Sequence, residues 1–357
     1  MTTLAYDGRR RIRDQPGLGH NRWHPDLEPL ATVKPGEEIS LETGDAADAQ
    51  LSPGSSHADV AKVELGWAHP LTGPVYVEGA EPGDLLEIEL VELVSQPWGF
   101  TALIPGFGFL ADLFPDPFLV GWEIDGKHAR SKELPGVAIP ADIFPGVIGI
   151  APSHKDMARM RAREEELAAR GGAVAGDQPE TAFPPACAGG LRTIPPREVG
   201  GNMDVRQLTK GSKLLLPVSA RGALFSVGDV HFAQGDGEVC GTGIEICATV
   251  TVRFQVQKNP RWMPRFPAFH APAKPERASF GVTGMPITED GRNESLDLTL
   301  SARSALLAMI DYLVATYGFS REAAYALCSV AVDLRLSEVV DVPNPIFSAL
   351  VPYDIFG

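Results

Sequence analysis

Acidic, amide and glycine residues are concentrated between Val227 and Glu245, in the stretch VGDVHFAQGDGEVCGTGIE. The segment ALFSVGDVHFAQ, which overlaps its start, has the apolar character of a strand. Side chains two residues apart in a strand project from the same face, so we expect Asp229 and His231 to lie side by side. A carboxylate and an imidazole presented together are ligands that divalent metals accept. The stretch therefore predicts a metal site with Asp229 and His231 as ligands.

The residues after this strand give the chain a route back to the same face. Gly235 and Gly237 permit a tight turn, which would return Glu238 toward the two ligands. A carboxylate in that position is suited to act as a general base, with Glu245 as the substitute. The alternative is structural: the aspartate caps a turn, the histidine is a satisfied half-buried side chain, and the glycines shape a hairpin. The accumulation of acidic and amide groups in one turn favours the functional interpretation.

Composition limits the classes of partner. The 357 residues are 44% hydrophobic and 22% charged, as is typical of a globular protein with a substantial core. The formal net charge is -15, which argues against nucleic acid and anionic membranes as partners. We find no apolar run approaching the roughly 20 residues of a bilayer span, and no apolar segment of a secretory signal. We therefore expect a cytoplasmic protein with no nucleic-acid or membrane partner.

The four cysteines, at positions 187, 240, 247 and 328, are scattered and form no CxxC pair. This spacing predicts neither a disulfide framework nor a thiolate zinc site. We expect most of them to be small buried hydrophobic residues.

Most of the chain predicts strands. The 37 glycines and 31 prolines interrupt the sequence at short intervals, which favours strands and turns over long helices. Apolar and acidic residues alternate from Leu86 to Leu93, and ICATVTVRFQVQ is both alternating and β-branched. Together with the 223–233 segment, these patterns predict a mainly β, sandwich-like fold with a few appended helices, α+β overall.

Helices are expected at three places. HKDMARMRAREEELAARGG contains strong helix formers and ends on two glycines. A second helix would place Leu306, Met309, Ile310 and Leu313 on one face, and a third would begin at Ser320. We expect residues 1–357 to form a single unit or two intimately joined subdomains, with 171–196 as an irregular linker or lid.

Six blocks follow one another along nearly the whole chain: HNRWHPDLEPLATVKPGEEISLET, HPLTGPVYVEGAEPGDLLEIEL, PGVIGIAPS, GGNMDVRQLTKGSKLLLPV, GALFSVGDVHFAQGDGEVCGTGIE and SVAVDLRLSEVVDVPNPIFSALVP. In this order they resemble the acetamidase/formamidase family. The resemblance implies a mainly β, usually cytoplasmic homo-oligomer (a dimer or larger) that hydrolyses formamide or acetamide to the carboxylic acid and ammonia. It also implies an associated divalent metal, often zinc. HNRWHPD is more similar to the formamidase branch, and GEVCGT to the acetamidase branch, so the acyl group stays open.

The resemblance adds candidate site residues. His20 and His69 lie in the first two blocks, and either could complete the metal shell. Each has a structural alternative: His20 could fix the N-terminal arm to the body or to a neighbouring subunit, and His69, before Pro70, could shape a turn. Asn202 and Asp204 could hold the amide or orient a ligand, or form an Asx-turn.

Amide hydrolysis needs a strong nucleophile, stabilisation of the oxyanion and a proton for the leaving amine. A divalent metal can supply the first two, and Glu238 could move the protons. Two alternatives stay open. Cys240 could be the nucleophile, with Lys213 as the nearest candidate for the lysine that some cysteine amidases use. The acidic loop could instead bind calcium and stabilise a non-enzymatic β module.

Overall fold

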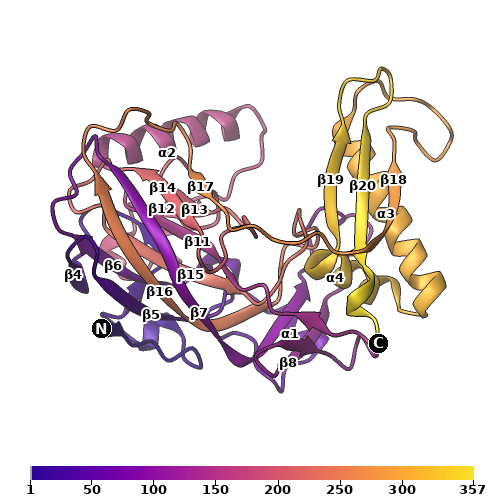
Figure 1. Ribbon diagram of the computed structural model, residues 1–357, viewed down its shortest axis with the longest axis horizontal. Coiled ribbons are helices and arrows are strands. Elements are labelled where there is room, and N and C mark those ends of the chain that lie inside the picture. The colour runs from indigo at the N-terminus through magenta and orange to yellow at the C-terminus, as the bar shows by residue number, and fades with distance from the viewer. Residues whose placement is uncertain (1) are drawn as a thin grey trace.

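The computed structural model describes residues 2–357, which form a large β body and a smaller C-terminal unit. Figure 1 shows the body around a curled sheet, with the C-terminal unit beside it in orange and yellow. Within the described residues, strands form a 15-stranded sheet, a three-stranded sheet and a two-stranded ribbon. The expectation of a mainly β fold with appended helices is confirmed.

The 15-stranded sheet makes up the body. Its strands are β1 (Thr2–Leu4), β2 (Gly19–His20), β4 (Ala31–Val33), β5 (Glu38–Thr43), β6 (Leu71–Val77), β7 (Leu85–Leu103), β8 (Phe118–Ile124), β9 (His128–Arg130), β10 (Ile139–Pro140), β11 (Phe144–Ile150), β13 (Gly200–Asn202), β14 (Lys213–Pro217), β15 (Phe225–His231), β16 (Glu245–Gln257) and β17 (Ala268–His270). Its main order is β10-β9-β8-β7-β16-β15-β11-β13. β15, which carries Asp229 and His231, therefore lies beside β16, which carries Glu245, and β11 separates it from β13, which carries Asn202.

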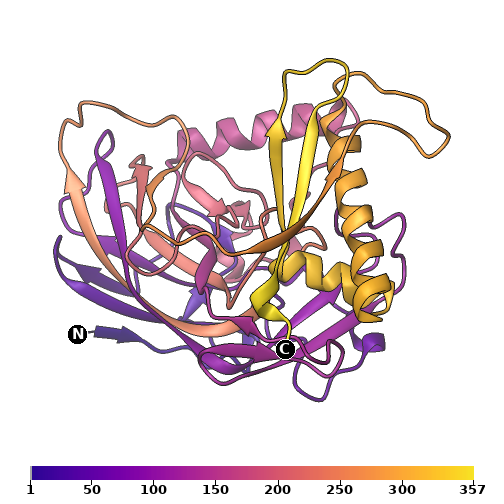
Figure 2. The same ribbon diagram turned by 45° about the vertical axis from the view of Figure 1, so that its right-hand side comes forward.

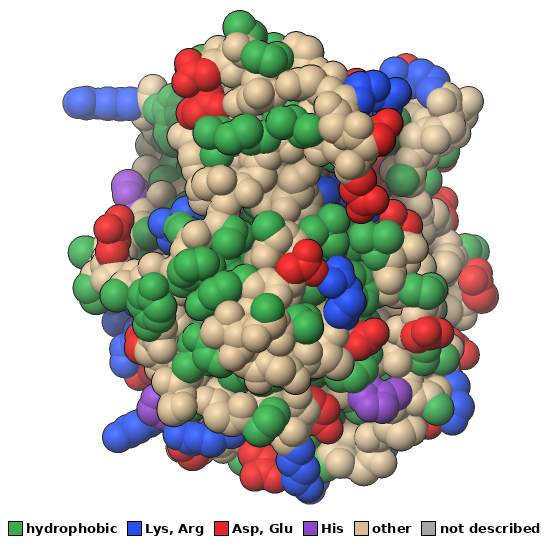
Figure 3. Space-filling model, turned by 90° about the vertical axis from the view of Figure 1, so that its right-hand side faces the viewer, with side chains coloured by type: hydrophobic (Ala, Val, Ile, Leu, Met, Phe, Trp, Pro, Cys, Tyr) green, Lys and Arg blue, Asp and Glu red, His purple; other side chains and the backbone are tan. Residues whose placement is uncertain are grey.

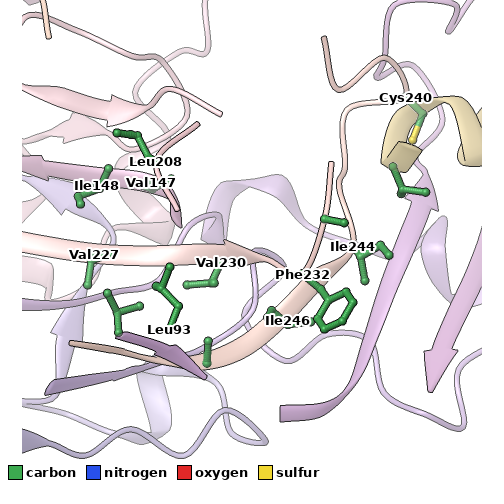
Figure 4. Packing of buried hydrophobic residues seen from close by; sticks show 14 of the residues in the cluster. Leu93, Val147, Ile148, Leu208, Val227, Val230, Phe232, Cys240, Ile244 and Ile246 are labelled. Carbon is green, nitrogen blue, oxygen red and sulfur yellow. The ribbon is translucent and has the colours of Figure 1, made fainter. Parts of the chain in front are cut away.

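The predicted strands at 223–233 and 246–256 correspond to β15 and β16. Every residue of β15 is buried. Apart from Ser226, Asp229 and His231, the strand has no polar side chain, as is typical of a strand that is covered on both faces. Figure 4 shows Val227 and Val230 of β15 among other buried apolar side chains, including Ile246 of β16 and Ile148 of β11. The site is therefore built on the rigid centre of the body.

Helices lie at the three expected places. They are α2 (His154–Ala169), α3 (Leu298–Tyr317) and α4 (Arg321–Ala331); a short α1 (His57–Val60) and the 3-10 turns η1 (Ile12–Asp14), η2 (Leu65–Trp67), η3 (Pro179–Thr181), η4 (Pro185–Cys187) and η5 (Tyr353–Ile355) are additional. The Ser320 side chain accepts from the Ala323 N–H and caps α4, as predicted. The predicted face of α3 is also buried.

Residues 171–196 contain η3, η4 and strand β12 (Leu191–Arg192), which pairs with β3 (Arg22–Trp23). The Arg22 Nη2 group donates to the carbonyl of Gln178 at 2.8 Å. The segment therefore packs on the N-terminal arm. Its role as a lid and the division of the chain into subdomains stay predictions.

The C-terminal unit consists of α3, α4 and the antiparallel sheet β18 (Ser279–Gly284), β20 (Ile346–Pro352) and β19 (Asp333–Glu338), with β20 in the middle. Figure 2 shows α3 alongside these strands. By length and composition α3 could cross a membrane, contrary to our expectation that no segment is apolar enough. The helix also has the character of a core helix, because it buries Leu306, Met309 and Ile310.

Apolar side chains are exposed on the C-terminal unit. Val340 is 74% exposed and Val342 is 72% exposed, in the turn between β19 and β20. Figure 3 shows hydrophobic side chains gathered on this face of the molecule. Exposed apolar patches often mark contact surfaces; the homo-oligomer and the cytoplasmic location stay predictions.

Helix α4 holds the loop between β15 and β16, residues 232–244, which we call the site loop. The Ser329 hydroxyl donates to the Thr242 carbonyl at 2.7 Å and accepts from the Cys240 N–H at 3.1 Å. The Tyr325 hydroxyl donates to the Val239 carbonyl. Figure 4 shows Cys240 beside this helix. The C-terminal unit thus fixes the loop that carries Glu238.

Gly235 allows the site loop to approach the end of α4. A Cβ atom at Gly235 would lie 2.1 Å from the Val332 carbonyl oxygen, which is backbone and cannot rotate away. We expect Gly235→Ala to lower the free energy of unfolding by about 1–3 kcal/mol and to reduce activity. Thermal unfolding and turnover measure this. Gly54→Ala is the control, because a Cβ there meets no atom within 4 Å; equal stability of the two variants would contradict the prediction.

Candidate active site

The His231 imidazole lies at the centre of a cluster of carboxylates. Its Nε2 atom is 3.2 Å from Glu245 Oε2 and 3.3 Å from Asp229 Oδ1. The same atom is 3.9 Å from Glu238 Oε1 and 4.0 Å from Asp204 Oδ1. Four acidic side chains thus surround one imidazole nitrogen, and two of them, Asp229 and Glu245, are almost fully buried.

Strand pairing and a local kink together form this cluster. His231 of β15 is directly opposite Glu245 of β16, which places the two side chains together. Asp229 reaches the same place with a positive φ of 51°, so β15 does not follow simple alternation there. Asp204 and Glu238 also have positive φ angles, 50° and 43°. Left-handed backbone in non-glycine residues costs about 1–3 kcal/mol and gathers at functional sites.

Gly146 of β11 provides room for two of the carboxylates. A Cβ atom at this position would lie 2.5 Å from Asp204 Oδ1 and 2.7 Å from Asp229 Oδ2. The carbonyl of Gly146 also accepts from the Met203 N–H at 3.0 Å, which fixes the chain just before Asp204. A residue without a side chain is therefore required beside the site.

Gln234 sets the proton position on His231. The Gln234 Nε2 group donates to the Asp204 carbonyl at 3.0 Å, so its Oε1 atom faces the imidazole. His231 Nδ1 lies 2.7 Å from this oxygen and must donate to it. In the neutral imidazole, Nε2 then carries a lone pair directed at the carboxylates, which is the tautomer of a metal ligand.

Burial and mutual repulsion shift the pKa values of the cluster. Burial raises the pKa of Asp204 to about 6 and that of Glu245 to about 8. Burial, with the charge of Asp204 added, raises the pKa of Glu238 well above its usual value. Burial disfavours the charged form of His231, but Glu245 and Asp229 outweigh it and raise the pKa of the imidazole. The pKa of Asp229 is lowered, because His69 and His231 outweigh its burial.

The residues fit a divalent cation. Two sets have ligand atoms within 4.8 Å of one another: Asp204, Asp229 and His231, and His231, Glu238 and Glu245. Asp204 Oδ1 and Glu245 Oε2 are buried and have no hydrogen-bond partner among the described residues. Buried polar atoms are normally satisfied, and a cation would satisfy both. Three or four O and N donors suit zinc or a similar divalent ion.

The other predicted residues are placed differently. His69 Nε2 is 3.9 Å from Asp229 Oδ2, and its Nδ1 atom is buried without a partner among the described residues. Asn202 lies on β13 and lines a cavity that Asp229 and Glu245 also line. His20 contacts a residue outside the cluster: its Nε2 atom is 2.7 Å from Ser226 Oγ. His20 belongs to neither of the two sets of possible ligands.

Cys240 is poorly placed for the alternative chemistry. Its side chain is fully buried, and burial raises the pKa of the thiol. A thiolate is the nucleophilic form, so this environment disfavours it. The Lys213 Nζ group on β14 donates to Glu87 Oε1 on β7 at 2.7 Å. The sulfur contacts Thr242 instead of a base, and Cys240 does not line the cavity beside the carboxylates.

A small cavity opens on the cluster. Its volume is about 70 Å³, and its lining includes Asp229, Glu238, Glu245, His69 and Asn202. A water molecule needs roughly 10–15 Å³ of such volume, so the cavity accepts a molecule of several non-hydrogen atoms. Acidic groups, an imidazole and a small cavity are the parts of a hydrolytic site.

Comparison with known proteins gives the class. Residues 5–357 match the model of the Acetamidase/Formamidase family, and the chain belongs to this family. It is therefore an amidase of the formamidase/acetamidase type, as the resemblance implied. The non-enzymatic calcium module is not supported by this membership.

Individual relatives cover almost the whole chain. A formamidase from Methylophilus methylotrophus is 35% identical, over 99% of this chain and 93% of its own length. An acetamidase from Mycolicibacterium smegmatis is 35% identical, over 91% of this chain and 88% of its own. The solved structure of a gamma lactamase from Delftia acidovorans has a TM-score of 0.94 at 35% identity, over 100% of this chain and 93% of that one.

Metal removal should make stability depend on pH. Asp204, Glu245 and His231 have raised pKa values, and the stability that a raised group contributes is lost as the pH rises through its folded pKa. The pKa of Asp229 is lowered, so the stability that Asp229 contributes is lost as the pH falls. That loss occurs below about pH 4. We expect the melting temperature of chelator-treated protein to fall by several degrees from about pH 6 to about pH 8.

A saturating divalent metal should remove this fall, because it binds the charged carboxylates of the folded state. Glu245→Gln should make the fall of the chelated protein shallower, since it deletes the group whose pKa is about 8 while Glu238 and His231 remain. Differential scanning calorimetry measures both profiles. A chelated protein that becomes more stable over this range would contradict the charge distribution described above.

Proposed function

We propose that this amidase hydrolyses short aliphatic amides, such as formamide or acetamide, to the carboxylic acid and ammonia by means of a divalent metal, with zinc as the first candidate and calcium as an alternative. The carboxylate cluster around His231 is the observation that carries the proposal. It offers the Nε2 atom of His231 and several carboxylate oxygens as ligands, beside a cavity of about 70 Å³. The printed names of the formamidase and acetamidase relatives support the substrate class.

Asp204, Asp229 and His231 would hold the metal. This set contains the left-handed Asp204 and Asp229, and Gly146 leaves space for both carboxylates. A divalent cation bound there would provide a water of lowered pKa and polarise the substrate carbonyl. Gln234 keeps the imidazole in the required tautomer. Asp204, which was expected to hold the amide or to orient a ligand, would then be a metal ligand itself.

Glu238 would move the protons. It lies in the site loop and lines the cavity, and burial raises the pKa of its carboxyl well above the usual value. A raised pKa favours a carboxyl group that both accepts and returns a proton. It would accept a proton from the attacking water and return it to the nitrogen as the C–N bond breaks. Asn202 lines the same cavity with a buried Oδ1 atom that lacks a partner among the described residues, so it could accept from the amide NH₂.

Substitutions separate the two roles. Asp229→Ala and His231→Ala should lose bound metal and activity together. Glu238→Gln should keep the metal, while turnover falls by roughly 10²- to 10⁴-fold, the usual contribution of a positioned general base. Elemental analysis and turnover of each purified variant give the comparison. If Glu238→Gln loses the metal and Asp204→Ala retains it, the ligand set is His231, Glu238 and Glu245 instead.

Cyclic amides are a second candidate, favoured by the TM-score of 0.94 to the gamma lactamase. Hydrolysis of an open-chain primary amide releases ammonia, whereas ring opening of a lactam yields an amino acid and none. We expect ammonia from formamide, acetamide or propionamide. Ring opening of a γ-lactam, followed by chromatography, without ammonia release from any open-chain amide would replace the first candidate by the second.

A further inference from the structure

The cavity beside the carboxylates is lined by apolar side chains as well. Six of these apolar residues, from three separate segments of the body, are Ala47, Leu51, Phe100, Ile104, Phe107 and Ile194. Ala47, Leu51 and Phe100 belong to a small hydrophobic cluster that is distinct from the main core. We call these six residues the apolar wall. A substrate whose amide group meets the carboxylates would therefore place its acyl group against the apolar wall.

The members of the apolar wall differ in how much of each side chain is exposed. Leu51 is 3% exposed and Phe100 is 1% exposed, so both are held by packing. Phe107 is 40% exposed, which makes it the most accessible member of the apolar wall. A change of side chain at Phe107 would alter the size of the cavity with little effect on the core.

Phe107 is nevertheless held beside the site loop. Its N–H donates to the Ile104 carbonyl at 2.9 Å, and two residues later the Phe109 N–H donates to the Val239 carbonyl at 2.9 Å. The Phe107 ring lies on Gly241: a Cβ atom at Gly241 would be 2.4 Å from Phe107 Cε1. Gly241 in turn donates its N–H to the Glu238 carbonyl at 2.8 Å. The ring is therefore a neighbour of the proton-transferring residue.

We propose that the apolar wall selects amides with a carbon-bearing acyl group, and that Phe107 sets the upper limit of acyl length. This inference rests on the proposed amidase function. A formyl group has no carbon beyond the carbonyl and leaves the apolar wall uncovered. Each methylene that is buried against apolar side chains should raise kcat/KM by about fourfold, until the chain reaches Phe107.

The test is a series of open-chain amides of similar carbonyl reactivity: acetamide, propionamide, butyramide and hexanamide. For the unsubstituted protein we expect kcat/KM to rise about fourfold from acetamide to propionamide and to fall by hexanamide. Phe107→Ala should raise the ratio of hexanamide to propionamide by at least about tenfold. Phe107→Leu keeps an apolar side chain of intermediate size. Its ratio of hexanamide to propionamide should lie between the ratios of the unsubstituted protein and of Phe107→Ala.

Leu113→Ala is the matched control. Leu113 follows in the same segment and is 49% exposed, but it does not line the cavity. Its variant should leave the ratio unchanged. A flat series, or a Phe107→Ala variant that scales every substrate equally, would overturn the inference while leaving the amidase function intact. A protein that hydrolyses formamide but none of the four amides would overturn the inference alone. A protein that hydrolyses neither formamide nor any of the four would contradict the proposed function itself.

Discussion

One constraint governs this structure: four carboxylates surround a single imidazole nitrogen in a buried place. Gln234 Oε1 accepts a hydrogen bond from the Nδ1–H of His231, so in the neutral ring Nε2 presents a lone pair to Asp229 and Glu245. Two charged carboxylates whose oxygens lie within 4.8 Å of each other repel by at least about 3 kcal/mol at an effective dielectric constant of 20. Protons on the carboxyl groups or on the imidazole, or a bound cation, must therefore offset this repulsion. Gly146 and the left-handed Asp204, Asp229 and Glu238 are local features that such crowding requires.

The same constraint explains why the site is built from segments that lie far apart in the sequence. The cluster combines residues of β15 and β16 with Asp204, which follows β13, and Glu238 from the site loop. The loop could not hold charged groups together on its own, because repulsion would open it. Ser329 and Tyr325 of α4 hold it in place from the C-terminal unit. The body therefore supplies a rigid frame. The C-terminal unit holds the site loop through two residues that lie 86 and 87 positions farther along the sequence than their partners in the loop.

Sequence patterns were sufficient where the signal is local. Alternation and β-branching located β15 and β16, the apolar face located α3, and Ser320 located the start of α4. The cluster of Asp229, His231, Glu238 and Glu245 was visible because its members lie within one short stretch. Gly146 and the role of Asp204 were not predictable, since they depend on the pairing of β11 with β13 and β15. Gln234 was present in the quoted stretch, but its role follows only from the direction of its amide. His20 shows the opposite case: it lies in a recognisable block, yet its partner in the structure is Ser226.

The central claim is that a divalent cation, and not a proton alone, balances the carboxylates in the active enzyme. Elemental analysis of purified active protein, paired with ammonia release before and after complete chelation, tests it most directly. The account predicts about one divalent ion per chain, loss of activity on chelation, and recovery in proportion to the metal added back. Full activity in protein that contains no divalent metal would contradict it.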